Sequence, residues 1–164
     1  MINKKHIKII DTVLIVGTIL SIASFVVYAQ PLVISPLDNL KTTNNSVLFE
    51  FERGNVILID DNLEFTSPEK IYAEDNLVIN LKAGKYYWKV EGLVESEIRE
   101  ITIMSEVNLK IKKSADKFEI VNAGNVKLDV EVYDNESKVD NLVLDIDEEK
   151  EVAGTKFIGG EYEE

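Results

Sequence analysis

Residues 81–90 read LKAGKYYWKV, and this stretch decides the fold class that the sequence predicts. Tyr86, Trp88 and Val90 share one face of an extended chain, and the residues between them share the other. Side chains alternate in this way along a strand that has one face in a core and one face in water. The pair Ala83-Gly84 in front of the alternation is a turn signal. The stretch therefore predicts a turn followed by a half-buried antiparallel strand.

The same two-residue period recurs on both sides of this stretch. Alternating or β-branched runs occupy residues 46–52, 55–60, 77–81, 98–103, 107–111, 118–121, 126–132 and 142–146. Turn residues separate these runs, and no segment after residue 30 keeps a helical period. The sequence predicts an all-β chain after residue 30, with a sandwich at 31–103 and a small second β-domain at 104–164.

Three segments connect the first of these regions with a known family. They are the entry PLVISP at 31–36, the FEF strand at 49–51 and the stretch at 81–90. On these segments, residues 31–103 resemble a fibronectin type III or immunoglobulin-like module of a prokaryotic surface protein. The resemblance implies a sandwich and says little about function, because this fold hosts many functions.

The resemblance also implies a tyrosine corner, in which a tyrosine hydroxyl bonds back to the main chain. The residues that match this corner are Leu81, Gly84 and Tyr86, with Trp88 following in the same strand. The phase of the alternation favours Tyr86 over Tyr87 as the corner residue. The chain departs from the family pattern in one respect, since its single tryptophan is in this strand and not in the second one.

The region 104–164 is expected to abut the first region without a flexible linker. Its segment FEIVNAGNV at 118–126 is similar to the strand, Asn-Gly-Asn, strand corner of small surface β-domains. The tail at 159–164 contains two glycines and three glutamates, so we expect it to be solvated and frayed.

The N-terminal region 1–30 differs sharply from the remainder. Residues 12–29 read TVLIVGTILSIASFVVYA and carry no charge. As a helix this run is about 27 Å long, close to the hydrocarbon thickness of about 30 Å in a bilayer. Lysines precede the run at positions 4, 5 and 8, and the next basic residue is Lys41. The positive-inside rule then predicts a single-pass membrane anchor with a cytoplasmic N-terminus and an external β-region.

A cleaved signal peptide is the alternative interpretation of this region. Val27 and Ala29 occupy the positions that a signal peptidase requires before Gln30, and cleavage after Ala29 would secrete the β-region. The apolar run is longer than the 7–15 residues typical of a cleaved signal. Its length favours a retained anchor, and both interpretations export the remainder of the chain.

Composition excludes several classes of function. After residue 11 the chain has 15 basic and 29 acidic residues, a formal charge of −14. This negative charge argues against binding to nucleic acid, because no basic stripe is present to displace counterions from phosphates. The chain has no cysteine, which excludes disulfides, thiolate metal sites and thiol catalysis.

Candidate chemical sites are few. The single histidine, His6, lies before the apolar run, so the exported region has no imidazole for a catalytic triad. The pair Asp60-Asp61 and the acidic run at 145–149 are the remaining carboxylate clusters. Asp145, Asp147 and Glu149 offer hard oxygen ligands for calcium, without the glycine of an EF-hand loop. We expect no catalysis, no cofactor and no dedicated metal site.

Three further positions are candidates for modification or binding. Asn44 and Asn135 each begin an Asn-x-Ser sequon in an expected turn, which makes them candidate glycosylation sites. Tyr87 faces away from Trp88 and is the aromatic that could contact a ligand.

Two functions agree with this sequence. The first is a membrane-anchored interaction or structural module of the cell envelope that binds a protein or glycan partner, with residues 12–29 in the membrane. The second is an accessory subunit of a larger membrane assembly, acting through the helix itself. Gly17, Ser21 and Ser24 are small residues that favour close helix approach in the second case.

Overall fold

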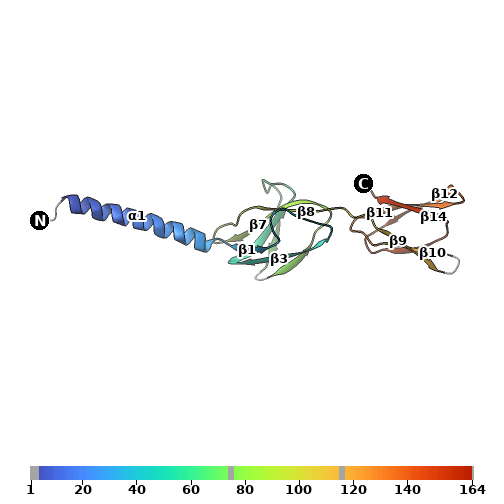
Figure 1. The fold of residues 1–164 in the computed structure, drawn as a ribbon, viewed down its shortest axis with the longest axis horizontal. Helices are drawn as coiled ribbons and strands as arrows, with labels where there is room; N and C mark the ends of the chain where they lie inside the picture. Colours follow the sequence, from blue (N-terminus) through green and yellow to red (C-terminus); the bar gives the residue numbers. More distant parts are fainter. Residues whose placement is uncertain (1–3, 74–75, 115–116, 164) are drawn as a thin grey trace. The chain divides into compact units, whose positions relative to one another are not determined.

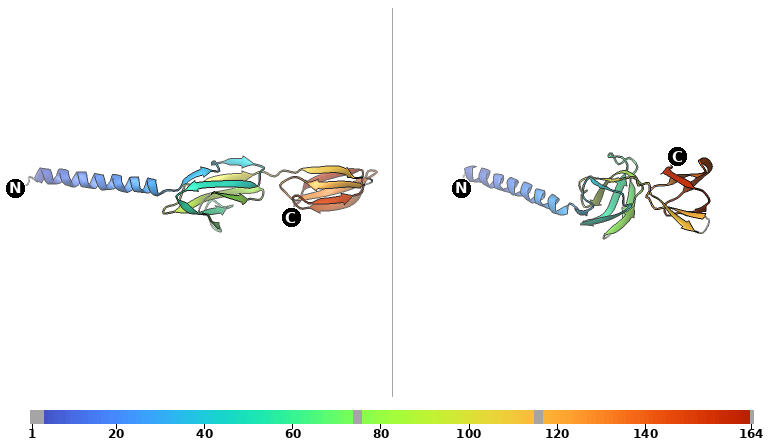
Figure 2. Two further views of the ribbon diagram at one scale, coloured as in Figure 1. Left: turned by 90° about the horizontal axis from the view of Figure 1, so that it is seen from below. Right: turned by 45° about the vertical axis from the view of Figure 1, so that its right-hand side comes forward.

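A computed structural model of the chain describes residues 4–73, 76–114 and 117–163. Side chains are described from residue 8 onward, with the exception of Ser114, so the side chain of His6 lies outside the described part. The chain begins with one helix, α1 (Lys4–Ala29), which is uninterrupted in all views (Figure 1, Figure 2). All further regular elements of the described residues are strands.

Helix α1 is apolar on every side. The segment Lys8–Ala29 has a mean hydropathy of 2.2, and its apolar window is not buried against any other part of the protein. A helix that is hydrophobic all round needs an apolar environment on all its faces. By length and composition α1 can therefore cross a membrane.

In the described residues, fourteen strands follow the helix. They are β1 (Leu32–Ser35), β2 (Leu40–Thr42), β3 (Ser46–Glu52), β4 (Gly54–Asp60), β5 (Glu69–Tyr72), β6 (Leu77–Asn80), β7 (Gly84–Gly92), β8 (Arg99–Ile103), β9 (Leu109–Ser114), β10 (Lys117–Asn122), β11 (Leu128–Asp134), β12 (Ser137–Leu144), β13 (Glu149–Val152) and β14 (Lys156–Glu161). The predicted mostly-β architecture is confirmed.

The strands form four sheets. Their orders are β1-β3-β6, β2-β8-β7-β4-β5, β13-β10-β9 and β12-β11-β14. Contacts between Cα atoms divide the chain into two compact units that interleave along the sequence. The first unit consists of Met1–Pro36, Phe49–Leu77 and Tyr87–Arg99, and the second of Leu37–Leu48, Val78–Tyr86 and Glu100–Glu164. The expected domain boundary between residues 103 and 104 stays a prediction.

An aromatic pair lies at the centre of the first unit. The rings of Phe49 in β3 and Trp88 in β7 meet edge to face, with centroids 4.8 Å apart and an interplanar angle of 86°. Both side chains are completely buried. Because β3 and β7 belong to different sheets, this contact joins the two sheets through one core. The alternation at residues 86–90 thus corresponds to burial of Trp88 and Val90.

The second unit has its own core between two layers. Figure 1 shows β11, β12 and β14 on one side of this layered part and β9 and β10 on the other. The buried cluster consists of Ile120, Val126, Leu128, Val130, Val132, Leu144 and Val152. Phe118 of β10 and Phe157 of β14 add an edge-to-face contact with ring centroids 5.3 Å apart.

Asn122 closes the corner between β10 and β11. Its amide nitrogen donates to the carbonyl oxygens of Val126, Leu144 and Asp145 at 2.8, 3.3 and 3.1 Å. Its side-chain oxygen accepts the N–H of Gly124 at 3.0 Å. The side chain is fully buried, so these bonds replace water for three main-chain carbonyls. The corner predicted from the Asn-Gly-Asn pattern is therefore held by a buried amide.

The expectation of a frayed tail is wrong for its first half. β14 continues to Glu161, with Gly159 opposite Val130 and Gly160 opposite Asp129 in the ladder with β11. The N–H of Tyr162 donates to the carbonyl of Lys127 at 2.9 Å. Position 159 favours glycine, because the Cβ atom of any other residue would come within 3.3 Å of Leu109. Gly159 thus serves close packing against Leu109 at a sheet edge, whereas Gly160 has open space around it.

The replacement Asn122→Ala tests the corner. It leaves three buried carbonyls without their donor, so we expect the second unit to lose about 3 kcal/mol of unfolding free energy. Chemical denaturation followed by far-ultraviolet circular dichroism measures the loss. Asn141→Ala is the matched control, because the Asn141 amide is exposed and bonds only Asp129; it should cost less than about 1 kcal/mol. Equal stabilities of the two variants would contradict this role.

Candidate functional site

The candidate site lies where the helix meets the first sheet. Only Gln30 and Pro31 separate the last residue of α1 from the first residue of β1. The N–H of Gln30 still donates to the carbonyl of Val26 at 3.1 Å, so the helical bonding continues past Ala29. Ala29 is only 6% exposed, while residues 8–28 of the helix are exposed. The helix is therefore joined directly to the β-region, with only two residues between them.

The turn between β3 and β4 supplies the one cation among the described residues that line this site. Arg53 is the turn residue and has a φ of 62°, a conformation that favours glycine or asparagine. Its carbonyl packs against Gly92, where a Cβ atom would approach the Arg53 oxygen to 2.4 Å and Pro31 to 3.3 Å. Only glycine leaves room for this approach. The turn, the end of β7 and the start of the β-region thus meet at one place.

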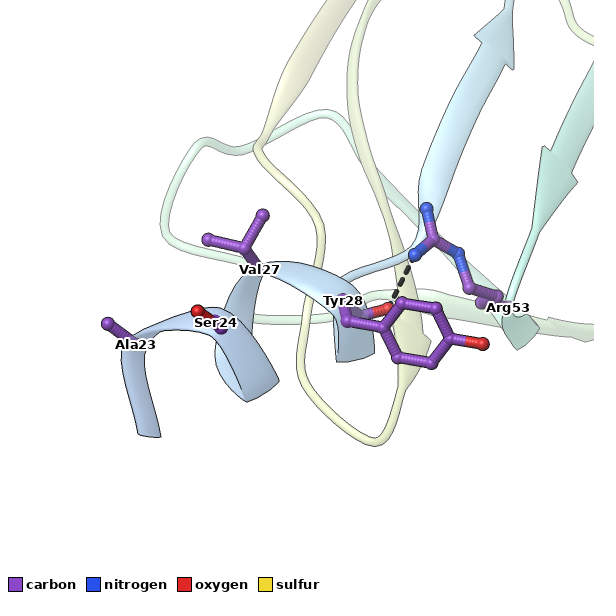
Figure 3. A pocket seen from close by; sticks show the side chains of 5 residues that line it. All are labelled: Ala23, Ser24, Val27, Tyr28 and Arg53. Carbon is purple, nitrogen blue, oxygen red and sulfur yellow. Dashed lines mark hydrogen bonds between the residues drawn. The ribbon is translucent and has the colours of Figure 1, made fainter. Parts of the chain in front are cut away.

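Arg53 reaches back to the helix. Its guanidinium donates a hydrogen bond to the carbonyl of Tyr28 and lies over the Tyr28 ring, 5.5 Å from the ring centroid (Figure 3). Carbonyls in the last turn of a helix have no partner within the helix, and a cation there also opposes the negative end of the helix dipole. The sequence forms this contact through a side chain that is 25 residues distant.

An open recess surrounds this contact. It has a volume of about 560 Å³ and is lined by Ala23, Ser24, Val27, Tyr28 and Arg53. In Figure 3 the helix side chains form one wall and Arg53 approaches from the β-region. The lining is mostly apolar with a single positive charge. This combination is suited to a group that carries a negative charge next to hydrocarbon.

The serine and threonine hydroxyls of the helix are hydrogen-bonded within it. Thr12, Thr18, Ser21 and Ser24 donate to the carbonyls four residues earlier, at 2.8 to 2.9 Å. Such bonds let hydroxyl groups enter an apolar environment without an unpaired donor. The hydroxyl hydrogens of Ser21 and Ser24 are therefore already used within their own helix.

The calcium candidates do not come together. Within the part of the chain that the structure describes, no group of three acidic or histidine side chains could hold a metal ion. Asp145 pairs with Lys127 at 3.2 Å, and Asp147 occupies a turn with a φ of 59°. Glu149 starts β13. The acidic run at 145–149 is interrupted by a turn, so the expected regular alternation of ligands is absent.

Three glutamates and a lysine line a smaller recess in the second unit. Its volume is about 300 Å³, and the lining residues are Glu119, Glu149, Lys150 and Glu151. Glu119 pairs with Lys112 at 3.2 Å and Glu151 with Lys117 at 3.1 Å. Glu119 and Glu151 are therefore engaged in ion pairs on the sheet surface.

The carboxylate of Asp60 organises a turn. It accepts the N–H groups of Ser67 at 2.9 Å and Asn62 at 3.1 Å. The bond from Ser67 is the main cause that lowers the pKa of Asp60, and burial opposes this effect. Both carboxylate oxygens are occupied by the main chain. Asp60 therefore has a structural role in the loop after β4, and its neighbour Asp61 is exposed.

Both sequons lie at the surface. Asn44 is exposed, and its side-chain oxygen accepts the N–H of Ser46 at 3.0 Å in a local turn. Asn135 is exposed in the two-residue turn between β11 and β12, where Asn135 and Glu136 have φ values of 45° and 69°. Glycosylation at Asn44 and Asn135 stays a prediction.

The predicted corner residue Tyr86 bonds back to the main chain. The hydroxyl of Tyr86 donates to the carbonyl of Lys82 at 3.1 Å, four residues upstream. Leu81 and Trp88 are buried, and Gly84 begins β7. Tyr87 is half-buried, so it is less open to a ligand than its phase suggested.

Sequence reasoning missed Arg53. The tripeptide Arg-Gly-Asn at 53–55 has the composition of a turn, and nothing local indicates that its first side chain contacts the helix. The sequence contains one indication of a special role for Arg53: Arg53 and Arg99 are the only arginines among its 18 basic residues. Arginine is preferred over lysine where several donors must be fixed in one geometry.

Comparisons with known proteins supply no family for this chain. No protein-family model matches it, and the search of curated proteins returned no match. A function for the chain must therefore be argued from its own residues.

The low pKa of Asp60 predicts how acid affects stability. Because its folded pKa lies below the reference value of 3.8, the ionised carboxylate stabilises the fold above that pH. The contribution is lost as the pH falls through the folded pKa. Asp60→Asn should therefore flatten the acid side of a plot of unfolding midpoint against pH, whereas the exposed control Asp134→Asn should keep the wild-type slope. A wild-type slope in Asp60→Asn would disprove this.

Proposed function

We propose that this protein is a membrane-anchored, extracytoplasmic module of the cell envelope that binds a protein or glycan partner without catalysis. The observation that carries the proposal is helix α1, which is apolar on all sides and exposed from residue 8 to residue 28. A helix of this kind is stable in lipid and would aggregate in water. The β-region that follows directly is the part available to a partner.

Retention of the anchor is supported by the state of the candidate cleavage site. A protease needs an accessible and locally unfolded segment. Here the helix continues through Ala29, Ala29 is buried, and Arg53 holds the carbonyl of Tyr28. Once the β-region has folded, the bond between Ala29 and Gln30 is protected. We therefore favour a retained anchor over a cleaved signal.

The proposed orientation follows from charge. Lys4, Lys5 and Lys8 precede the span, and the segment after it up to Lys41 has no basic residue. Lysines that flank one end of a membrane span mark that end as the cytoplasmic one. The acidic β-region would then be external.

The first β-region is proposed to be a fibronectin type III or immunoglobulin-like sandwich. The bond from the Tyr86 hydroxyl to the Lys82 carbonyl supports it, because this is the geometry of a tyrosine corner. The contact between Phe49 and Trp88 across two sheets also supports it. Such a module typically presents loops and sheet faces to other macromolecules.

An accessory subunit acting through its helix is the second candidate. Gly17 provides a small-residue position that would let another helix approach closely. The hydroxyls of Ser21 and Ser24, however, donate within α1, which reduces what they can contribute to a second helix. This observation favours the first function over the second.

The absence of cysteine from the sequence allows a direct test of placement. Single-cysteine variants Lys8→Cys and Lys70→Cys are treated, in intact cells, with a maleimide that cannot cross membranes. We expect label at residue 70 without lysis and at residue 8 only after lysis, and both variants should remain in the membrane pellet after an alkaline wash. Label at residue 8 in intact cells, or release of the chain by the wash, would contradict the proposal.

A further inference from the structure

We propose that the membrane-proximal end of the first unit binds the phosphate group of a phospholipid in the outer leaflet. Arg53 supplies the positive charge, and Tyr28 and Leu93 lie among the headgroups beside it. This inference depends on the proposed function, because it requires α1 to span the membrane with its carboxyl end at the outer surface.

The recess at the end of α1 matches the chemistry of a headgroup. A phospholipid presents a charged phosphate directly above hydrocarbon. The recess is lined by Arg53 together with the apolar side chains of Ala23 and Val27 on the helix. A guanidinium has five N–H donors, and Arg53 uses one of them on the Tyr28 carbonyl. The remaining donors can bind phosphate oxygens, for which arginine is well suited.

The charge of Arg53 is not neutralised by a neighbouring acid. Among the described side chains, no carboxylate lies within ion-pair distance of Arg53. The other arginine, Arg99, pairs with Glu97 at 2.8 Å and also donates to main-chain carbonyls. Arg53 is thus a cation without an acidic partner in a region whose formal charge is −14. Its place at the end of the span is where phosphates are concentrated.

The backbone at Arg53 adopts a conformation that is uncommon for its side chain, as it does at five other non-glycine residues of the described chain. Its φ of 62° is a conformation in which a non-glycine residue is disfavoured. A tight turn alone would be better served by glycine or asparagine. Backbone strain of this kind is found at ligand-binding positions, where the side chain is needed.

Leu93 extends this surface. It follows Gly92, whose backbone packs against the Arg53 carbonyl and near Pro31. Leu93 is 83% exposed, the highest value among the large apolar side chains of the described residues. A leucine exposed to this degree beside the end of a membrane span gains free energy by entering the headgroup boundary. Tyr28, 73% exposed, is an aromatic residue of the type enriched at that depth.

Lipid retention tests the role of Arg53. The full-length chain is reconstituted in vesicles of phosphatidylethanolamine and phosphatidylglycerol, extracted in mild detergent, and analysed by native mass spectrometry for bound phospholipid. We expect Arg53→Gln to retain about five-fold less lipid than the wild type. Arg53→Lys, which keeps the charge, should retain more than Arg53→Gln. Lys70→Gln removes an exposed charge from β5 and should behave as the wild type. Equal retention in Arg53→Gln and the wild type would overturn the inference.

Depth measurement gives an independent test that does not alter Arg53. An environment-sensitive dye is attached to Leu93→Cys or to the control Leu63→Cys, again in the full-length chain. β4 begins next to Gly92 and runs for about 20 Å before the loop that contains Leu63. We expect a quencher attached to lipid headgroups to quench the dye at position 93 and not at position 63.

The two tests separate this inference from the function on which it depends. A chain that stays in the membrane pellet, but shows equal quenching at positions 93 and 63, would overturn lipid contact and leave the anchor intact. A chain that leaves the membrane pellet would overturn the anchor itself. The unfolding midpoint of Arg53→Gln, measured alongside, identifies a variant that retains less lipid only because it is unfolded. The depth measurement then decides the question.

Discussion

The hydrogen bond from the Arg53 guanidinium to the Tyr28 carbonyl joins the helix to the β-region. The last carbonyls of a helix have no partners within it, and at a membrane surface an unpaired carbonyl is costly. Arg53 supplies a donor and a compensating charge at that point. Because only two residues separate α1 from β1, this bond also determines how the main chain leaves the helix. The burial of Ala29 and the recess beside Tyr28 both depend on that path.

The second arginine reinforces the same segment. Arg99 donates to the carbonyls of Pro36 and Val33 at 3.0 and 3.1 Å, so both arginines of the chain bind main-chain oxygens between residues 28 and 36. An arginine can hold two carbonyls at once because its donors are fixed in a plane. The segment after the span is therefore built as part of the β-region. Of these contacts, only the bond from Arg53 to Tyr28 would be lost if α1 were removed after Ala29.

The sequence predicted those elements whose pattern is local. The apolar run of α1 and the alternation in β3, β7 and β11 follow directly from periods that burial imposes. The strands that were not predicted, β2, β5, β13 and β14, all lie at sheet edges. Edge strands tolerate charge and glycine because one side faces solvent, so EKIY in β5 and EKEV in β13 show no apolar period. The site was not predictable for a related reason, since the contact between Arg53 and Tyr28 spans 25 residues and leaves no local pattern.

The central claim is that α1 remains attached to the β-region in the mature protein. Its most direct test is the N-terminal sequence and intact mass of the protein isolated from membranes of the producing cell. The account predicts a chain that still contains residues 12–29, because Ala29 is buried and the helix continues through it. A mature chain that begins at Gln30 would contradict it, and would identify α1 as a signal that is removed.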